Sequence, residues 1–359
     1  MRISDFTPPL PFVIADAHVP PPPPPPMPEE KPTAFSINQL LDRSMIAMNR
    51  KLERLLNIRP NAEKVAHDLL AGSTAEQSMA EFEEVVQARR ARHQMWAQQV
   101  RVCCSVLKTC SKELSPEQLG HIHTEQDRIL RNLSLFAPLE ISDAFDAIIN
   151  SPNDFFDKLL ELIELIKNGY LAGYEHIIKA YSDFFAAFNE KITAKMKEWI
   201  ESGNDGKDVS LNVRELKQAL DALIKEFGHP NPASVLFPAP GMAGATKEEA
   251  EKWRLALGLP ESCLKKNADG TYCVVIDLTP LTIMVTSLPE NGHEWVQMDN
   301  AKYQAWQTGF NAQEERLKNM LQSLTQKYSN ANSYHDNFNK TLSSHLNQFA
   351  DMLKAMLNF

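Results

Sequence analysis

Apolar residues recur at alternating steps of three and four along two long stretches of the chain, the period of helices that pair along a seam. The first stretch begins at Ser151-Pro152 and continues to the breaker Gly203-Asn-Asp-Gly206. Its length of about 46 residues corresponds to a rod of roughly 70 Å, which no compact globule encloses. This helix therefore needs an equally long partner. Its seam positions are Leu159, Leu162, Ile166, Tyr170, Tyr174, Ile177, Tyr181, Phe184, Phe188, Ile192, Met196 and Trp199, and core packing is favoured over a ligand cage for its aromatic members.

The C-terminal stretch supplies that partner. Asp299 is a good N-cap, and from there to Phe359 the chain contains no proline and only one glycine. The three-four alternation continues from Leu317 to Met356. We expect residues 150–202 and 299–357 to form a long antiparallel central coiled coil, closed by the C-terminal helix.

Residues 35–136 also carry helical patterns. Apolar positions run at helical spacing to Pro60, and a short helix follows that ends near Gly72. A longer seam from Met79 to Leu114 stops at Ser115-Pro116, where serine is placed to cap the next helix and proline fits its first turn. We therefore expect N-terminal helices followed by a helical hairpin.

Strand patterns are confined to residues 203–298. We expect a small distal α+β domain here, with a sheet of about three strands and a helix that begins at the capping box Thr246-Lys-Glu-Glu249. The predicted fold class is mainly α with this small α+β insertion. The expected strands are Val209–Val213, Thr271–Asp277 and Glu294–Met298.

Residues 1–34 form a proline-rich leader that contains seven consecutive prolines, Pro20 to Pro26. Proline lacks an N–H donor and has a fixed φ, so this run cannot join a helix or a central strand. We expect an extended, disordered segment. A passive spacer is favoured over a polyproline ligand for SH3-like partners, because basic flanking residues in the required register are missing.

Charge and hydropathy exclude several classes. The net charge of −9 and the pI near 5.6 argue against non-specific nucleic-acid binding. One local basic segment is interpreted as a solvated helix face. The N-terminus has no Sec-type signal and no stretch approaches a membrane span, so these signals alone indicate a cytoplasmic protein unless another export route exists. The basic segment comprises Arg89, Arg90, Arg92, Arg101, Lys108 and Lys112.

The five cysteines show no CxxC pair, and a disulfide framework is not expected. Pairing of Cys263 with Cys273 across a hairpin remains open. A zinc site that combines Cys103 and Cys110 with nearby histidines is disfavoured, because buried thiols fit the same spacing. There is no GxSxG, HExxH or P-loop motif, so we expect neither an enzyme nor a metal site.

Two unusual runs in the C-terminal stretch carry a family resemblance: Asp299-Asn-Ala-Lys-Tyr-Gln-Ala-Trp306 and Gln326-Lys-Tyr-Ser-Asn-Ala-Asn-Ser333. With them, residues 299–344 resemble the needle-tip proteins of bacterial type III secretion systems. Weaker similarity extends back to about residue 200, as in Ile276-Asp-Leu-Thr-Pro280. Before residue 150 only the arrangement of elements matches.

The resemblance implies a hydrophilic translocator that leaves the cell by type III export, with its secretion signal in the leader, and stays at the bacterial surface on the needle tip. It implies capping of the needle, sensing of host contact or of bile salts such as deoxycholate, control of secretion, and scaffolding of the translocator pore for effector delivery and host invasion. Expected partners are the needle subunit, the hydrophobic translocators, further copies of the protein at the tip and the nearby host membrane. The hairpin is expected to act as a self-chaperone.

The polar run after Tyr328 is the candidate site, because Ser and Asn are costly in the middle of a helix without a compensating partner. Two interpretations stay open: a polar layer that fixes the register of the coiled coil, and a docking face for the needle subunit. His335 lies at a core position, where a tolerated seam residue is favoured over a pH sensor. The predicted needle-binding residues are Tyr328, Asn330, Asn332, Ser333, Asp336, Asn337, Phe338 and Leu342.

A competing hypothesis from another class is an intracellular coiled-coil scaffold whose proline-rich leader recruits an adaptor. Export with an active type III apparatus separates the two. A bile-salt groove is expected, if present, where the hairpin leaves the coil, because a steroid needs an apolar cleft with a few polar ends.

Overall fold

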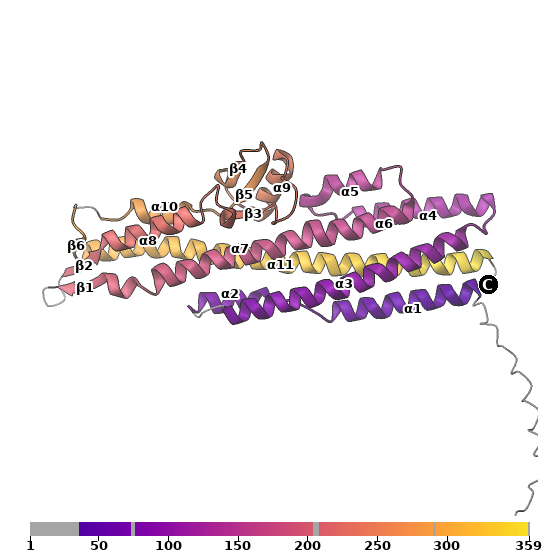
Figure 1. Ribbon diagram of the computed structural model, residues 1–359, viewed down its shortest axis with the longest axis horizontal. Helices are drawn as coiled ribbons and strands as arrows, with labels where there is room; N and C mark the ends of the chain where they lie inside the picture. Colours follow the sequence, from indigo (N-terminus) through magenta and orange to yellow (C-terminus); the bar gives the residue numbers. More distant parts are fainter. Residues whose placement is uncertain (1–35, 73–75, 204–207, 290–291, 358–359) are drawn as a thin grey trace, which may run out of the picture. The chain divides into compact units, whose positions relative to one another are not determined.

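The computed structural model describes residues 36–72, 76–203, 208–289 and 292–357, and the chain from Ile37 onward forms one compact unit. The predicted leader, residues 1–34, lies outside the described residues. Helices dominate the described chain and small antiparallel sheets accompany them (Figure 1). This confirms the predicted fold class.

Two helical stretches lie side by side at the centre of this unit (Figure 1). The C-terminal one, α11, is an unbroken helix of 58 residues, about 87 Å long at 1.5 Å per residue. It begins after Asp299, whose carboxylate accepts a hydrogen bond from the Lys302 backbone N–H at 2.8 Å, as expected for the N-cap. The elements of the pair are α6 (Phe155–Glu164), η2 (Leu165–Leu171), α7 (Ala172–Phe188), η3 (Asn189–Thr193), η4 (Met196–Trp199) and α11 (Asn300–Leu357).

Side-chain contacts fix the antiparallel direction of the pair. Near one end, the rings of Phe156 and Phe349 lie 6.0 Å apart. Further along, the Tyr170 ring lies 5.6 Å from that of Tyr334. Contacts continue in this order to Tyr181, whose hydroxyl donates to the carbonyl of Leu317 at 3.1 Å. Residue numbers thus rise along one helix as they fall along the other, as predicted.

The first member of the pair is less regular than the sequence predicts. The predicted helix of about 46 residues widens into π-helical turns at η2 and η3, and after η4 the chain turns into a strand. A π turn adds one residue to the helix and rotates the side chains that follow. Three-four spacing does not reveal such an insertion, because seam residues stay buried on both sides of it.

The N-terminal helices pack along the central pair. At the hairpin turn Ser115 caps α4, as expected, and it forms a capping box with Gln118. The first of these helices packs on α3 and on α11, and α3 also contacts α6 and α11 (Figure 1). These helices are α1 (Ile37–Leu56), α2 (Ala62–Leu70), α3 (Glu76–Ser111), α4 (Pro116–Ser134) and, after the short η1 (Leu139–Ile141), α5 (Ser142–Ile149).

The insertion contains two sheets, not the single sheet of about three strands that we expected. All three predicted strands exist, but they are divided between the sheets, and each sheet gains strands too short to show alternation in the sequence. One sheet has the order β1-β2-β6 and the other β3-β5-β4, both antiparallel. The strands are β1 (Ile200–Gly203), β2 (Asp208–Asn212), β3 (Val235–Phe237), β4 (Leu264–Lys266), β5 (Tyr272–Val275) and β6 (Trp295–Asp299); the accompanying helices are α8 (Val213–Glu226), η6 (Pro232–Ser234), α9 (Lys247–Leu257), η7 (Glu261–Cys263) and α10 (Thr279–Thr286).

The second sheet and α9 form a side unit that packs against α7, partway along the coil (Figure 1). Trp253 of α9 is the central contact: its ring stacks on Phe237 at 4.6 Å and lies 5.2 Å from the ring of Tyr174. The indole also lies directly over Gly173, where a Cβ would come within 2.6 Å of it. Glycine at this position therefore lets the side unit approach the central helix.

Candidate functional site

The predicted needle-binding residues do not share one face of α11. Tyr328 is buried with its ring 5.4 Å from that of Phe82 on α3, whereas Phe338 is buried with its ring 6.5 Å from that of Phe145 on α5. Leu342 is also fully buried, so Phe338 and Leu342 belong to the core and are not open to a docking partner. Exposure is limited to the polar members: Asn330, Ser333 and Asn337 are exposed and Asn332 is half-buried.

Five of these eight residues line one groove of about 520 Å³. Its other wall is the segment from Arg59 to Glu63, which joins α1 to the first turn of α2, together with Arg89 of α3. The N-terminal helices therefore cover part of the predicted docking region. The α11 residues from the predicted set that line this groove are Tyr328, Asn332, Ser333, Asp336 and Asn337.

Arg89 holds the N-terminal helices to α11 through a buried polar cluster. Its guanidinium donates to the carbonyl of Ile58 at 2.5 Å, contacts Nδ1 of His335 at 3.1 Å and forms an ion pair with Asp336. Asn339, one helical turn further along α11, hydrogen-bonds the His335 ring. Three segments that are distant in sequence thus meet at one arginine, which is only 2% exposed.

The prediction of a solvated basic face is wrong for Arg89 but not for Arg90, which is exposed. Arg89 is buried, and the neighbouring Arg90 donates to Glu175 on α7, a carboxylate that is itself buried. Consecutive arginines on α3 therefore bind the two members of the central pair, one each. The signal in the sequence was the position of Arg89 within the α3 seam, where a solvated charge has no place.

Burial and neighbouring charges shift the pKa values of this cluster. Burial alone would raise the pKa of Asp336, but hydrogen bonding to His335 and the Arg89 charge outweigh it and hold that pKa below its usual value. Burial lowers the pKa of His335, with Arg89 adding to the effect. For Glu175, burial raises the pKa despite the Arg90 guanidinium beside it.

A second histidine faces this cluster from α3. The ring of His93 lies 4.9 Å from that of His335, and the side chain is 2% exposed. Neither ring nitrogen of His93 has a hydrogen-bond partner among the described residues. Burial, followed by the charges of His335, Lys167 and Arg89, lowers the pKa of His93 to about 2. Both imidazoles are therefore neutral at physiological pH.

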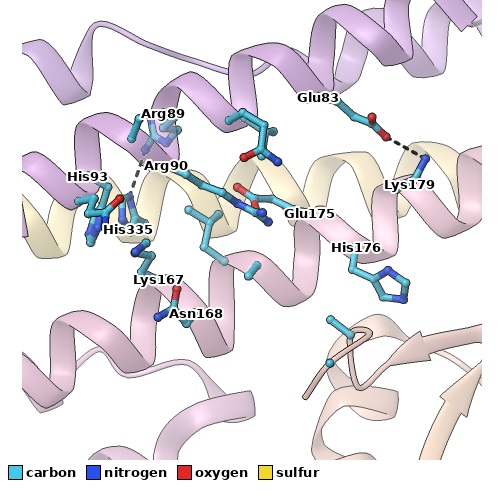
Figure 2. A pocket seen from close by; sticks show the side chains of 18 of the residues that line it. Glu83, Arg89, Arg90, His93, Lys167, Asn168, Glu175, His176, Lys179 and His335 are labelled. Carbon is cyan, nitrogen blue, oxygen red and sulfur yellow. Dashed lines mark hydrogen bonds and ion pairs between the residues drawn. The ribbon is translucent and has the colours of Figure 1, made fainter. Parts of the chain in front are cut away.

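A larger groove of about 750 Å³ lies between α3, the η2–α7 segment and the loop of residues 239–242 (Figure 2). Ion pairs Arg90–Glu175 and Lys179–Glu83 link α3 to α7 along it. Lys167 makes no ion pair or hydrogen bond within the described ranges, and Figure 2 shows it beside His335. The apolar part of the lining includes Phe82, Val86, Leu171, Pro240 and Met242. We call this the hairpin groove.

The described residues contain no metal cluster, disulfide or membrane-spanning helix. Across the described ranges, no group of three or more His, Cys, Asp or Glu side chains is arranged to hold a metal ion. All five cysteines are buried free thiols, including Cys263 and Cys273. Of the helices in the described residues, none combines the length and the apolar character needed to cross a lipid bilayer.

Comparison with known proteins gives a consistent result. Residues 39–357 match the sequence model of a family described as type III secretion systems tip complex components. The chain is 44% identical over 211 residues to the cell invasion protein SipD of Salmonella typhi, a match that covers 58% of this chain and 62% of SipD. It is 39% identical over 231 residues to invasin IpaD of Shigella flexneri, covering 64% of this chain and 67% of IpaD. These matches therefore span about two thirds or less of either relative.

A solved structure is also similar to this chain in its fold. The pathogenicity island 1 effector protein of Chromobacterium violaceum superposes with a TM-score of 0.64 at 29% identity, over 87% of this chain and 99% of that one.

Proposed function

Because the chain belongs to the family of type III secretion systems tip complex components, we propose that it is exported by the type III route and caps the secretion needle. There it controls secretion and provides the platform on which the hydrophobic translocators assemble their pore in the host membrane. Its role is structural and sensory, without catalysis. The observation that carries this proposal is the family match, which extends over nearly all of the described residues.

Docking on the needle is assigned to the exposed polar row of α11, Asn330, Ser333 and Asn337. These side chains offer donors and acceptors to a partner without any change in the fold. Asp336 is excluded from this first contact, because its carboxylate is engaged by Arg89. We therefore assign the two interpretations of the polar run to different residues. The buried residues fix the register of the helices, and the exposed residues dock on the needle subunit.

Replacement of Asn330, Ser333 and Asn337 by alanine tests the docking row. We expect binding to isolated needles to fall at least tenfold, with helical content and melting temperature unchanged because all three side chains are exposed. A matched variant with Gln304, Gln307 and Asn311 replaced, also exposed on α11, should bind normally. Equal binding by both triple variants would remove the docking row from the proposal.

Export distinguishes this function from an intracellular scaffold. With an active type III apparatus, the protein should appear in the culture medium and on purified needles. In a strain that lacks the export ATPase it should remain inside the cell. Retention in both strains would overturn the tip assignment and favour the scaffold.

The N-terminal helices are proposed to shield the coil before assembly. Two contacts support this: Phe82 covers Tyr328, and Arg89 engages Asp336, both on α11. Displacement of α3 would uncover both residues beside the docking row. Tyr328 and Asp336 would then take part in needle binding only after α3 has moved away from α11.

The hairpin groove is proposed to bind an amphipathic anion such as deoxycholate. Its volume lies within the range of small-molecule sites. Apolar side chains such as Leu171 line it for a steroid face, and Lys167 offers a cation that no hydrogen bond or ion pair engages among the described residues. A ligand held between α3 and α7 would act on the helices that shield the coil, which connects sensing to assembly.

Titration calorimetry with deoxycholate tests the groove. We expect binding to the native protein and at least tenfold weaker binding to Lys167→Gln, because the carboxylate loses its counter-charge. Lys195→Gln changes an exposed lysine outside the groove and should bind as the native protein does. Undiminished binding to Lys167→Gln would place any deoxycholate site elsewhere.

A further inference from the structure

The contact between α3 and α11 contains two buried histidines that no step of the proposed function uses. His93 and His335 face each other across this contact, 4.9 Å apart, and the Arg89 guanidinium lies 3.1 Å from Nδ1 of His335. We propose that this pair is an acid-sensitive latch: protonation of the two imidazoles releases α3 from α11 while the central coil stays folded. The inference does not depend on needle binding or on a ligand in the hairpin groove.

Charge repulsion is the physical basis of the latch. A protonated His93 would stand beside Arg89 of its own helix and Lys167 of η2, both of which already disfavour its charge. Its ring nitrogens have no acceptor within the described residues to stabilise a proton. Protonation of His335 would add one more cation to the same space, where the carboxylates of Asp336 and, on α7, Glu175 are opposite in sign.

The direction of the pH effect follows from linkage. An exposed imidazole has a pKa of about 6.5, whereas the closed form keeps both rings neutral to lower pH. The open form, in which α3 is released from α11, therefore binds more protons below pH 6.5 than the closed form, in which α3 is packed on α11. The closed form loses stability relative to the open form as the pH falls. For His93 alone, the ratio of open to closed protein should rise about 30-fold between pH 7.5 and pH 5.0.

Other groups that face the pair do not cancel this effect in the same window. The pKa of Asp336 is held below its usual value, so its contribution is lost only at more acidic pH. Arg89 and Lys167 are the cations that face the pair. Glu175 on α7 acts in the opposite direction, because its raised pKa favours proton uptake in the closed form, but it is a single group against two histidines.

Amide hydrogen exchange at pH 7.5 and pH 5.0, corrected for intrinsic rates, tests the latch in the full chain. We expect α3 peptides to lose protection by about 30-fold or more at pH 5.0, while α7 and α11 stay protected. The double variant His93→Gln and His335→Gln should keep α3 protected at both pH values. Unchanged protection of native α3 at pH 5.0, or loss in α3, α7 and α11 together, would overturn the proposal.

Two further variants make the result specific. His93→Gln alone removes no hydrogen bond, so it should fold even if the double variant does not. In this variant the loss of α3 protection between pH 7.5 and pH 5.0 should be about 30-fold smaller than in the native protein. His345→Gln changes a half-buried histidine of α11, whose pKa is also lowered by burial but which lies away from α3, near Arg128 and Glu125 of α4. It should leave the α3 response intact. A full acid response in His93→Gln would contradict the latch.

Discussion

Arg89 shows how one residue gives the fold its specificity. Its guanidinium contacts Ile58, His335 and Asp336, which belong to the α1–α2 connection and to α11. A buried ion pair is weak evidence for net stability, because desolvation offsets much of the attraction. The ion pair instead specifies how the helices pack, since any other register of α3 on α11 would leave Asp336 buried without a cation.

Arg89→Ala should therefore destabilise the protein strongly. We expect the free energy of unfolding to fall by about 3–5 kcal/mol, because Asp336 would remain buried without its partner. Urea denaturation at pH 7.5 measures this. Arg92→Ala, an exposed position on the same helix, should change stability by no more than about 0.5 kcal/mol. Equal effects of the two substitutions would show that the ion pair does not hold α3 in place.

Among the elements, α9 and the β3-β5-β4 sheet depend on the central helix for their position. The Trp253 ring packs against Gly173, and Lys252 forms an ion pair with Asp143 at the start of α5. The carbonyl of Val235 in β3 contacts Nε2 of His176 at 2.9 Å. The loop of residues 239–242 belongs to this side unit and lines the hairpin groove. A shift of the side unit would therefore change the groove.

Gly173→Ala should displace the side unit. The new methyl group would lie 2.6 Å from the Trp253 ring, and overpacking of this kind costs about 1–3 kcal/mol. Hydrogen exchange of α9 should speed up, while exchange of α11 stays unchanged. Gly169→Ala is the matched control, because its nearest neighbour would lie 3.6 Å away, an ordinary contact. Normal protection of α9 in Gly173→Ala would refute the close approach.

At the scale of the whole unit, α11 is the element on which the others assemble. It contacts α1, α2, α3, α4 and α7 as well as α10. One face of its polar run meets the N-terminal helices and the other faces outward, so movement of α1–α3 would change which side chains of α11 are exposed. Asn49 of α1 and Asn347 of α11 exchange side-chain hydrogen bonds at 3.2 and 3.0 Å and mark this contact at the surface.

A reducible crosslink between cysteines at positions 49 and 347 should trap the closed form. We expect the linked protein to bind needles at least tenfold more weakly than the unlinked one, because Tyr328 and Asp336 stay covered. Reduction of the linker should restore binding in the same sample, which controls for the Asn49→Cys and Asn347→Cys substitutions themselves. Full binding by the linked protein would mean that assembly does not require α1–α3 to move.

The sequence alone determined the long antiparallel pair and most of the helix ends. Period and length sufficed, because a long apolar stripe must be covered by another of equal length. Capping signals at Ser115, Thr246 and Asp299 act within a few residues, and the structure contains each of them. The family resemblance in the C-terminal stretch likewise came from local runs of residues.

Only the tertiary structure decided which polar residues meet. Spacing assigns Arg89 and His335 to seams, but a seam has many positions and does not specify that these two, separated by 246 residues, share one layer. The same reason explains the edge strand β3 of the second sheet, because it pairs with β5 across the intervening α9 and β4. Periodicity gives each helix a face, whereas packing selects the partner for each residue on that face.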